Sequence, residues 1–157
     1  MERCCCCNAR LKGQQQCRRC QADLSQVIET ERMARYRLGK AIQFKQDNQW
    51  TQSIAAVSYS LQLKKTPLAI QFRQFLIQQL CRDTLNLLTE NQLLSAKRLL
   101  NQGKYLVLQT PQLQQLNNFT DYLLIAEAEK TDLQAEIKRY NTSVTKWAQG
   151  FNKYLHR

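Results

Sequence analysis

Two Cys-x-x-Cys pairs near the N-terminus constrain the fold of this chain more than any other feature. The pairs are Cys4/Cys7 and Cys17/Cys20. Each pair places two thiolates within reach of one ion, and four thiolates suit a closed, tetrahedral structural zinc site. Four cysteines also hold iron or iron–sulfur centres, and disulfide or thiol chemistry is a further alternative. The spacing favours Zn²⁺, with all four cysteines as structural ligands and no open catalytic position.

The other three cysteines fall outside this pattern. Cys5 and Cys6 lie inside the first pair, where we expect them to be bystanders or alternative ligands. Cys81 lies in an apolar helical stretch, and we expect it to be a small buried side chain.

The N-terminal segment reads as two knuckles in tandem, Cys-Cys-Cys-Cys-Asn-Ala-Arg-Leu at 4–11 and Cys-Arg-Arg-Cys-Gln-Ala-Asp-Leu at 17–24. They resemble the short zinc ribbons that begin many bacterial proteins, in which each knuckle is Cys-x-x-Cys-Gly. Asn8 and Gln21 stand where that family has glycine. The turn prefers a positive φ there, which Asn tolerates and Gln tolerates poorly. The resemblance implies a zinc ribbon over residues 1–24, a segment too short to bury a core unaided.

The rest of the chain is predicted to be mainly α-helical. Four Gly and two Pro among 157 residues are too few turn formers for a β-sandwich or barrel. Apolar periodicity predicts helices over about 25–45, 51–64, 68–89 and 92–108, with turns at 47–49 and 90–91. Two Thr-Pro steps, at 66–67 and 110–111, lie 44 residues apart. Two helices in each such unit are typical of an α-solenoid or a stack of helical hairpins.

The first of these helix pairs resembles a tetratricopeptide hairpin. The match falls on Ala41, Phe44, Asn48, Trp50, Ile54, Val57 and Leu61. These are the small, aromatic, turn and second-helix apolar positions of that motif. The resemblance implies an antiparallel helix pair, and the echo of the Thr-Pro steps extends it to two such hairpins over 25–111.

Residues 112–157 follow a heptad pattern that predicts one long C-terminal helix. Its apolar seam comprises Leu133, Ile137, Tyr140, Val144, Trp147, Phe151 and Tyr154. Backwards, the seam continues through Ala126, Leu123, Phe119 and Leu116, interrupted by Lys130. Its many aromatic residues favour docking into a groove over a regular two-stranded zipper, and the alternative is packing on the preceding helices. The stretch from Ile137 to Val144 also resembles the last helix of LemA-type proteins.

The chain is strongly basic, with a formal net charge of +11. Zinc held by four thiolates lowers this by two, because the ligands must be deprotonated. Such a balance favours an acidic partner, whether nucleic acid, an anionic membrane surface or an acidic protein face. The alternative is a solvated surface that confers solubility.

Catalytic motifs are missing from the sequence. His156 is the only histidine, next to the C-terminal residue. Phosphate-binding glycine loops and Gly-x-Ser-x-Gly are lacking, so we do not expect an enzyme. With no run of about 18 apolar residues and no signal-peptide core, we expect a cytoplasmic protein without a transmembrane segment.

These features together predict a non-catalytic, zinc-binding helical adaptor or accessory subunit that contacts protein partners within a larger complex. The alternative is a nucleic-acid-binding or regulatory zinc-ribbon protein. In that case phosphates would be contacted by the basic side chains beside the knuckles, Arg10, Lys12, Arg18 and Arg19.

Overall fold

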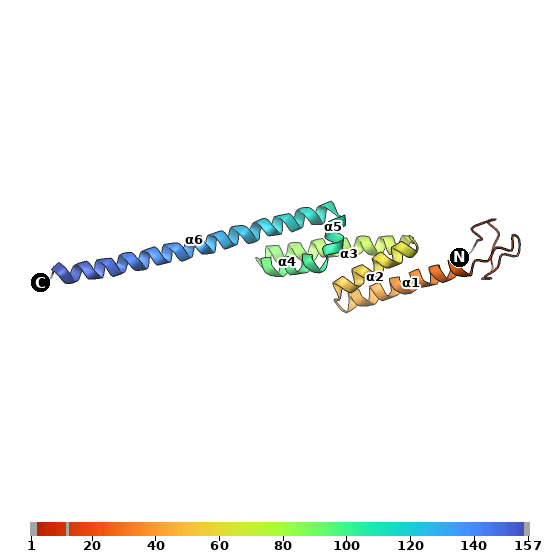
Figure 1. The fold of residues 1–157 in the computed structure, drawn as a ribbon, viewed down its shortest axis with the longest axis horizontal. Helices are drawn as coiled ribbons and strands as arrows, with labels where there is room; N and C mark the ends of the chain where they lie inside the picture. Colours follow the sequence, from red (N-terminus) through yellow and green to blue (C-terminus); the bar gives the residue numbers. More distant parts are fainter. Residues whose placement is uncertain (1–2, 12, 156–157) are drawn as a thin grey trace.

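The computed structural model describes the backbone of residues 3–11 and 13–155, and their side chains up to residue 142 except that of Tyr140. Within this part of the chain, a non-helical N-terminal segment precedes six helices (Figure 1). The helices are α1 (Ser25–Gln46), α2 (Trp50–Leu63), α3 (Pro67–Thr89), α4 (Leu93–Gln102), α5 (Lys104–Gln109) and α6 (Pro111–Leu155). The expectation of a mainly α-helical chain is confirmed.

Helices α1 and α2 run antiparallel and are joined by buried hydrogen bonds as well as by apolar contacts. The hydroxyl of Ser60 donates to the carbonyl of Ala34 at 2.8 Å, and that of Ser53 donates to the carbonyl of Ala41 at 2.7 Å. All four residues are buried. Alanine at the facing positions of α1 leaves room for the serines, so the two backbones approach closely.

The α1–α2 and α3–α4 connections are built in the same way. Asn48 and Asn91 each adopt a left-handed conformation, with φ of 57° and 58°. In both turns the amide of the residue after the asparagine donates at 2.8 Å to a carbonyl of the preceding helix. These bonds run from Gln49 to Phe44 and from Gln92 to Leu87. Asparagine tolerates this conformation, which commonly ends a helix and reverses the chain. The local turn chemistry therefore places α3 and α4 in the same antiparallel relation as α1 and α2.

The helix expected over 92–108 is divided at Gly103 into α4 and α5. Gly103 is buried against Leu80 of α3, where a side chain has no space. The amides of Leu106 and Val107 both donate to the carbonyl of Gly103, which begins α5. The expectation of one uninterrupted helix is wrong, because a tertiary contact at the glycine redirects the chain.

One apolar core joins the six helices. Each helix contributes at least one buried side chain, among them Leu38, Ile54, Leu76, Leu100, Leu106 and Leu113. At the edge of this core, the ammonium group of Lys97 on α4 lies 2.6 Å from the carboxylate of Asp121 on α6. Helix α6 is therefore fixed to the body along its first part.

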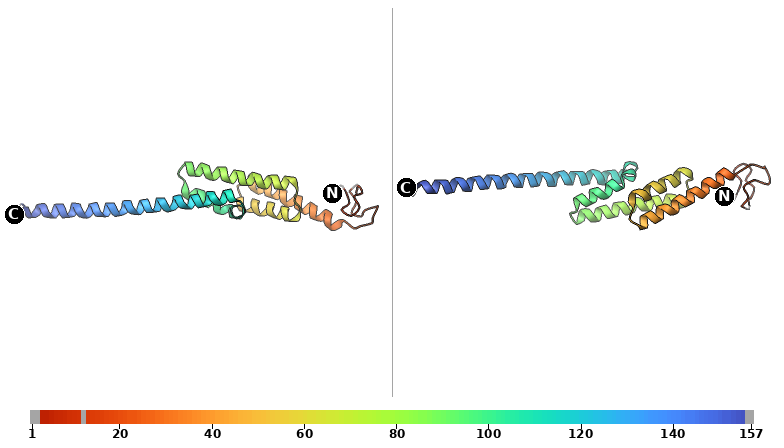
Figure 2. Two further views of the ribbon diagram at one scale, coloured as in Figure 1. Left: turned by 90° about the horizontal axis from the view of Figure 1, so that it is seen from above. Right: turned by 60° about the horizontal axis from the view of Figure 1, so that its bottom comes forward.

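Beyond that part, α6 extends past the other helices, and its end lies far from the N-terminal segment (Figure 2). Every described side chain from residue 125 to residue 142 is exposed. No helix in the described chain combines the length and apolar content that crossing a bilayer requires.

The heptad seam of α6 approaches the body only at its start, where Leu116 and Leu123 are half-buried. Leu113 and Thr120 are fully buried, whereas the seam residues Phe119, Leu133 and Ile137 are 51%, 60% and 53% exposed. At 3.6 residues per turn, Phe119 and Ile137 lie about 120° and Leu133 about 160° around the helix from Leu113. The expected packing of this helix on the preceding helices is therefore found along its first part, but Phe119, Leu133 and Ile137 do not take part in it. The later seam positions, Tyr140, Val144, Trp147, Phe151 and Tyr154, lie outside the described side chains.

Candidate metal centre

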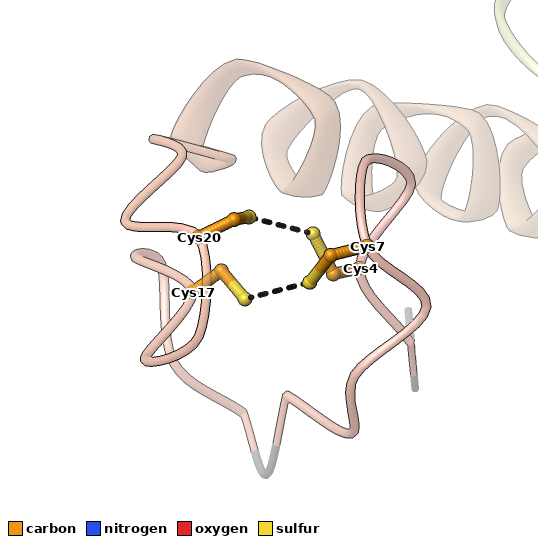
Figure 3. A group of neighbouring side chains, drawn as sticks. All are labelled: Cys4, Cys7, Cys17 and Cys20. Carbon is orange, nitrogen blue, oxygen red and sulfur yellow. Dashed lines mark hydrogen bonds between the residues drawn. The ribbon is translucent and has the colours of Figure 1, made fainter.

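The structure brings the four cysteines of the two Cys-x-x-Cys pairs together (Figure 3). All four sulfur atoms lie within 4.8 Å of one another. The Sγ atoms of Cys7 and Cys17 are 3.5 Å apart, and those of Cys4 and Cys20 are 3.7 Å apart. Tetrahedral zinc with Zn–S bonds of about 2.3 Å places its sulfurs about 3.8 Å apart. The predicted grouping is confirmed, and its spacing fits one Zn²⁺.

Each pair lies in a turn closed by the same two backbone hydrogen bonds. In the first turn, the amide of Cys4 donates to the carbonyl of Ala9 at 2.8 Å, and the amide of Asn8 donates to the carbonyl of Cys4 at 3.0 Å. The corresponding bonds of the second turn measure 3.0 Å and 2.8 Å. Asn8 and Gln21 have φ of 60° and 58°, as the knuckle pattern requires. Gln21 therefore adopts the left-handed conformation that its side chain disfavours.

Backbone amides stabilise the thiolate form of one cysteine in each turn. The amides of Cys7 and Cys6 lower the pKa of Cys4 to about 6, and the Cys6 amide lies 3.4 Å from the Cys4 sulfur. The equivalent amides of the second turn lower the pKa of Cys17. Hydrogen bonds to a charged group favour that charged form. The turn itself thus favours the thiolate, the form that binds a metal, for two of the four sulfurs.

The pKa of Cys20 shifts in the opposite direction from those of Cys4 and Cys17. The amide of Ala22 acts to lower its pKa, but hydrogen bonding with Cys7 and burial outweigh this and raise the pKa of Cys20 to about 12. Adjacent thiolates repel one another, so protons are retained in the cluster. A divalent cation removes this repulsion, because a coordinating thiol is deprotonated outright. The donor set is therefore matched to a bound metal.

A small apolar core supports the centre. Cys4 and Cys17 pack with Leu11 and Leu24, all of them buried, in a cluster separate from the core of the helical body. The two leucines occupy the same place in each knuckle, seven residues after its first cysteine. The sequence had not led us to assign these two leucines a role. Their repeated position in the two knuckles is the signal that could have indicated their packing against the cysteines.

The remaining sequence candidates are not members of the group of four sulfurs. Cys5 and Cys6 are exposed, and their sulfurs are 3.9 Å from each other. Cys81 is half-buried against the main core, and burial raises its pKa. The side chains of Arg10, Arg18 and Arg19 are exposed around the knuckles. Lys12 and His156 lie outside the described residues.

A second candidate site is a groove of about 630 Å³ between α2 and the α4–α5 segment. Its apolar surface includes Ile54 and Ala55 of α2 and the exposed side chains of Tyr59, Tyr105 and Leu108. The division of the helix at Gly103 gives α5 a separate direction, and α5 forms one wall of the groove. Sequence patterning did not predict this site, because it depends on that division.

No family model matches the chain, and no curated protein or solved structure is significantly similar to it. The resemblances to zinc ribbons, tetratricopeptide hairpins and LemA-type helices therefore stay interpretations of the sequence.

Proposed function

We propose that this protein is a non-catalytic, zinc-binding helical adaptor or accessory subunit of a larger complex. In this proposal, Zn²⁺ on Cys4, Cys7, Cys17 and Cys20 folds the N-terminal ribbon, and two tetratricopeptide-like hairpins present a surface to a protein partner. The metal has a structural role, because a site with four thiolate ligands leaves no position for a substrate.

The observation that carries the proposal is the apolar groove between α2 and α4–α5. Among the described residues that line it, Lys104 is the only one charged at neutral pH. A catalytic pocket normally places an acid, a base or a nucleophile near its substrate. An apolar groove between helices instead suits an amphipathic helix that inserts its apolar side chains. We therefore take the occupant to be an apolar helical segment of a partner protein.

A matched pair of substitutions tests this function. Leu108 lines the groove and is 64% exposed, whereas Leu68 on α3 is 59% exposed and lies outside the groove lining. Affinity purification from the native host is expected to recover a stoichiometric partner with the wild-type chain and with Leu68→Glu. Leu108→Glu is expected to lose that partner. The adaptor function is rejected if no stoichiometric partner is recovered, or if the two variants behave alike.

Nucleic-acid binding is the second candidate function, supported by the exposed arginines around the metal centre. Arg10, Arg18 and Arg19 lie where a phosphate backbone could approach the knuckles. Such binding weakens steeply as salt rises from about 50 to about 200 mM.

The double variant Arg18→Gln/Arg19→Gln should weaken nucleic-acid binding more than Arg82→Gln/Arg98→Gln, which removes the same charge from exposed positions on the helical body. Equal effects of the two double variants, or binding that does not depend on salt, would contradict this candidate.

A further inference from the structure

The C-terminal part of α6 has the properties of a helix that needs a partner. It continues to Leu155, although all its described side chains from residue 125 onward are exposed. Isolated helices gain little stability from propensity alone, and most helical stability in proteins comes from packing an apolar face. The sequence repeats apolar residues at alternating four- and three-residue spacings through this part. A second helix of matching length would cover them.

The seam is accessible without any rearrangement of the body. Leu113 and Thr120 face the other helices, while Leu133 and Ile137 are exposed about 160° and about 120° around α6 from Leu113. A helix laid along the seam beyond residue 125 therefore leaves the contacts between α6 and the body in place. If that helix belongs to a second copy, a two-fold axis along the seam places the two bodies on opposite outer sides.

The residue types at the a and d positions of the seam favour a coiled coil of two parallel helices. The spacing assigns Ile137 and Val144 to position a of the heptad and Leu133 to position d. β-Branched residues at a with leucine at d favour a parallel two-stranded coiled coil. The aromatic residues, which favoured a groove on sequence grounds, are Phe119 and those from Tyr140 onward, so the seam from Leu123 to Ile137 contains none.

Charge complementarity identifies a second copy of this chain as the partner. Lys130 occupies an a position and is the only charged residue of the seam. Glu127 and Glu129 occupy the neighbouring e and g positions. In a parallel, in-register pair, Lys130 of each chain lies beside Glu129 of the other chain. A single lysine at an a position also disfavours other registers and oligomer states.

We propose that two copies of this protein associate through the seam of α6 as a parallel, in-register coiled coil. The dimer presents two bodies and two metal centres, each body on an outer side of the paired helices. This association goes beyond the adaptor function and does not depend on the bound metal.

The mass of the full-length protein in solution tests the association. Light scattering or sedimentation equilibrium is expected to give twice the chain mass of 18.4 kDa. Ile137→Lys should raise the dissociation constant of the dimer more than about tenfold, because it places two charges in the seam. Ala135→Lys makes the same charge change on the opposite, exposed side of α6 and should leave the dimer intact. A monomeric wild-type chain, a larger oligomer, or equal effects of the two variants would overturn the proposal.

The orientation is tested by a Leu133→Cys variant under mild oxidation. A parallel, in-register pair brings the two introduced cysteines together, so mass spectrometry should identify a disulfide between positions 133. A dimer that forms no such link is antiparallel or out of register, and that result would overturn the proposed arrangement. Cys17→Ser should remain dimeric even when its metal is lost, which separates a failure of the seam from a failure of the adaptor function.

Discussion

Gly103, between α4 and α5, lies directly against Leu80 of α3. A Cβ atom added to Gly103 would be 2.4 Å from a methyl group of Leu80, a side chain that is itself fully buried. With φ of −89°, the backbone at Gly103 is one that any residue can adopt. The glycine is therefore required by the contact between helices and not by its own conformation.

The first prediction follows from this contact. Gly103→Ala should lower the free energy of unfolding by about 1–3 kcal/mol, because the core has no space for the added methyl group. Gly39→Ala is the matched control, since nothing lies within 4 Å of the corresponding Cβ on α1. That change should raise stability by about 0.5–1 kcal/mol, the helix-propensity difference between alanine and glycine. Urea denaturation followed by circular dichroism measures the free energy of unfolding of both variants. Equal changes in the two would contradict the close contact between Gly103 and Leu80.

The second prediction concerns two serines of α2. Ser60 donates a buried hydrogen bond to Ala34, whereas the buried hydroxyl of Ser58 has no hydrogen-bond partner among the described residues. Ser60→Ala should lower the free energy of unfolding by about 1 kcal/mol. Ser58→Ala should be neutral or stabilising, because it removes an unpaired polar atom. Thermal denaturation compares the stability of the two variants. A greater loss of stability in Ser58→Ala than in Ser60→Ala would be inconsistent with the hydrogen bonding described for the two serines.

The third prediction is a pH dependence of stability from the buried carboxylate of Glu31. A hydrogen bond from Lys64 lowers the pKa of Glu31 below its ordinary value of 4.5. The pair therefore stabilises the folded state fully above pH 4.5, and its contribution is lost as the pH falls through the folded-state pKa.

A Glu31→Gln variant should accordingly lose about 2 kcal/mol of stability at neutral pH and less at acidic pH. Glu29→Gln removes an exposed pair with Arg32 and should cost clearly less stability than Glu31→Gln, because water screens that pair. Urea midpoints measured from neutral to acidic pH test this. A destabilisation of Glu31→Gln that does not shrink on acidification would show that the ion pair is not its cause.

The fourth prediction is that metal removal affects only the N-terminal segment. The cysteine cluster packs on its own small core, apart from the core of the helical body. A chelator should therefore make Arg10, Arg18 and Arg19 accessible to trypsin while far-ultraviolet circular dichroism stays nearly unchanged. Adding Zn²⁺ should restore protection, and adding Ca²⁺ should not. Loss of most of the helical signal on chelation would contradict the independence of the two cores.

Features that depend on neighbouring residues in the chain could be predicted from the sequence. The Cys-x-x-Cys spacing identified the four clustered cysteines, because a short turn brings both thiols of a pair to one side. The turns at Asn48 and Asn91 were also predicted, since asparagine tolerates the conformation that ends a helix. The knuckle pattern likewise anticipated the positive φ of Asn8 and Gln21.

Features that depend on distant contacts could not be predicted in this way. Gly103 divides a helix because of Leu80, more than twenty residues earlier in the chain. Ser53 and Ser60 are buried between helices, but a search for apolar periodicity passes over serine. The direction of the α6 seam was also open, because α6 carries apolar residues on more than one side. The groove between α2 and the α4–α5 segment depends on how these helices pack, so it was not predicted from the sequence.

The most direct test of the metal centre is the zinc content of the purified protein, measured by elemental analysis. The wild-type chain should contain about one zinc ion, and Cys17→Ser should lose it, because three thiolates cannot complete a closed tetrahedral site. Cys5→Ser is the matched control and should keep the metal, since that thiol is exposed outside the cluster. Absence of zinc from the wild-type protein, or an unchanged zinc content in Cys17→Ser, would contradict the assignment of the four cysteines as zinc ligands.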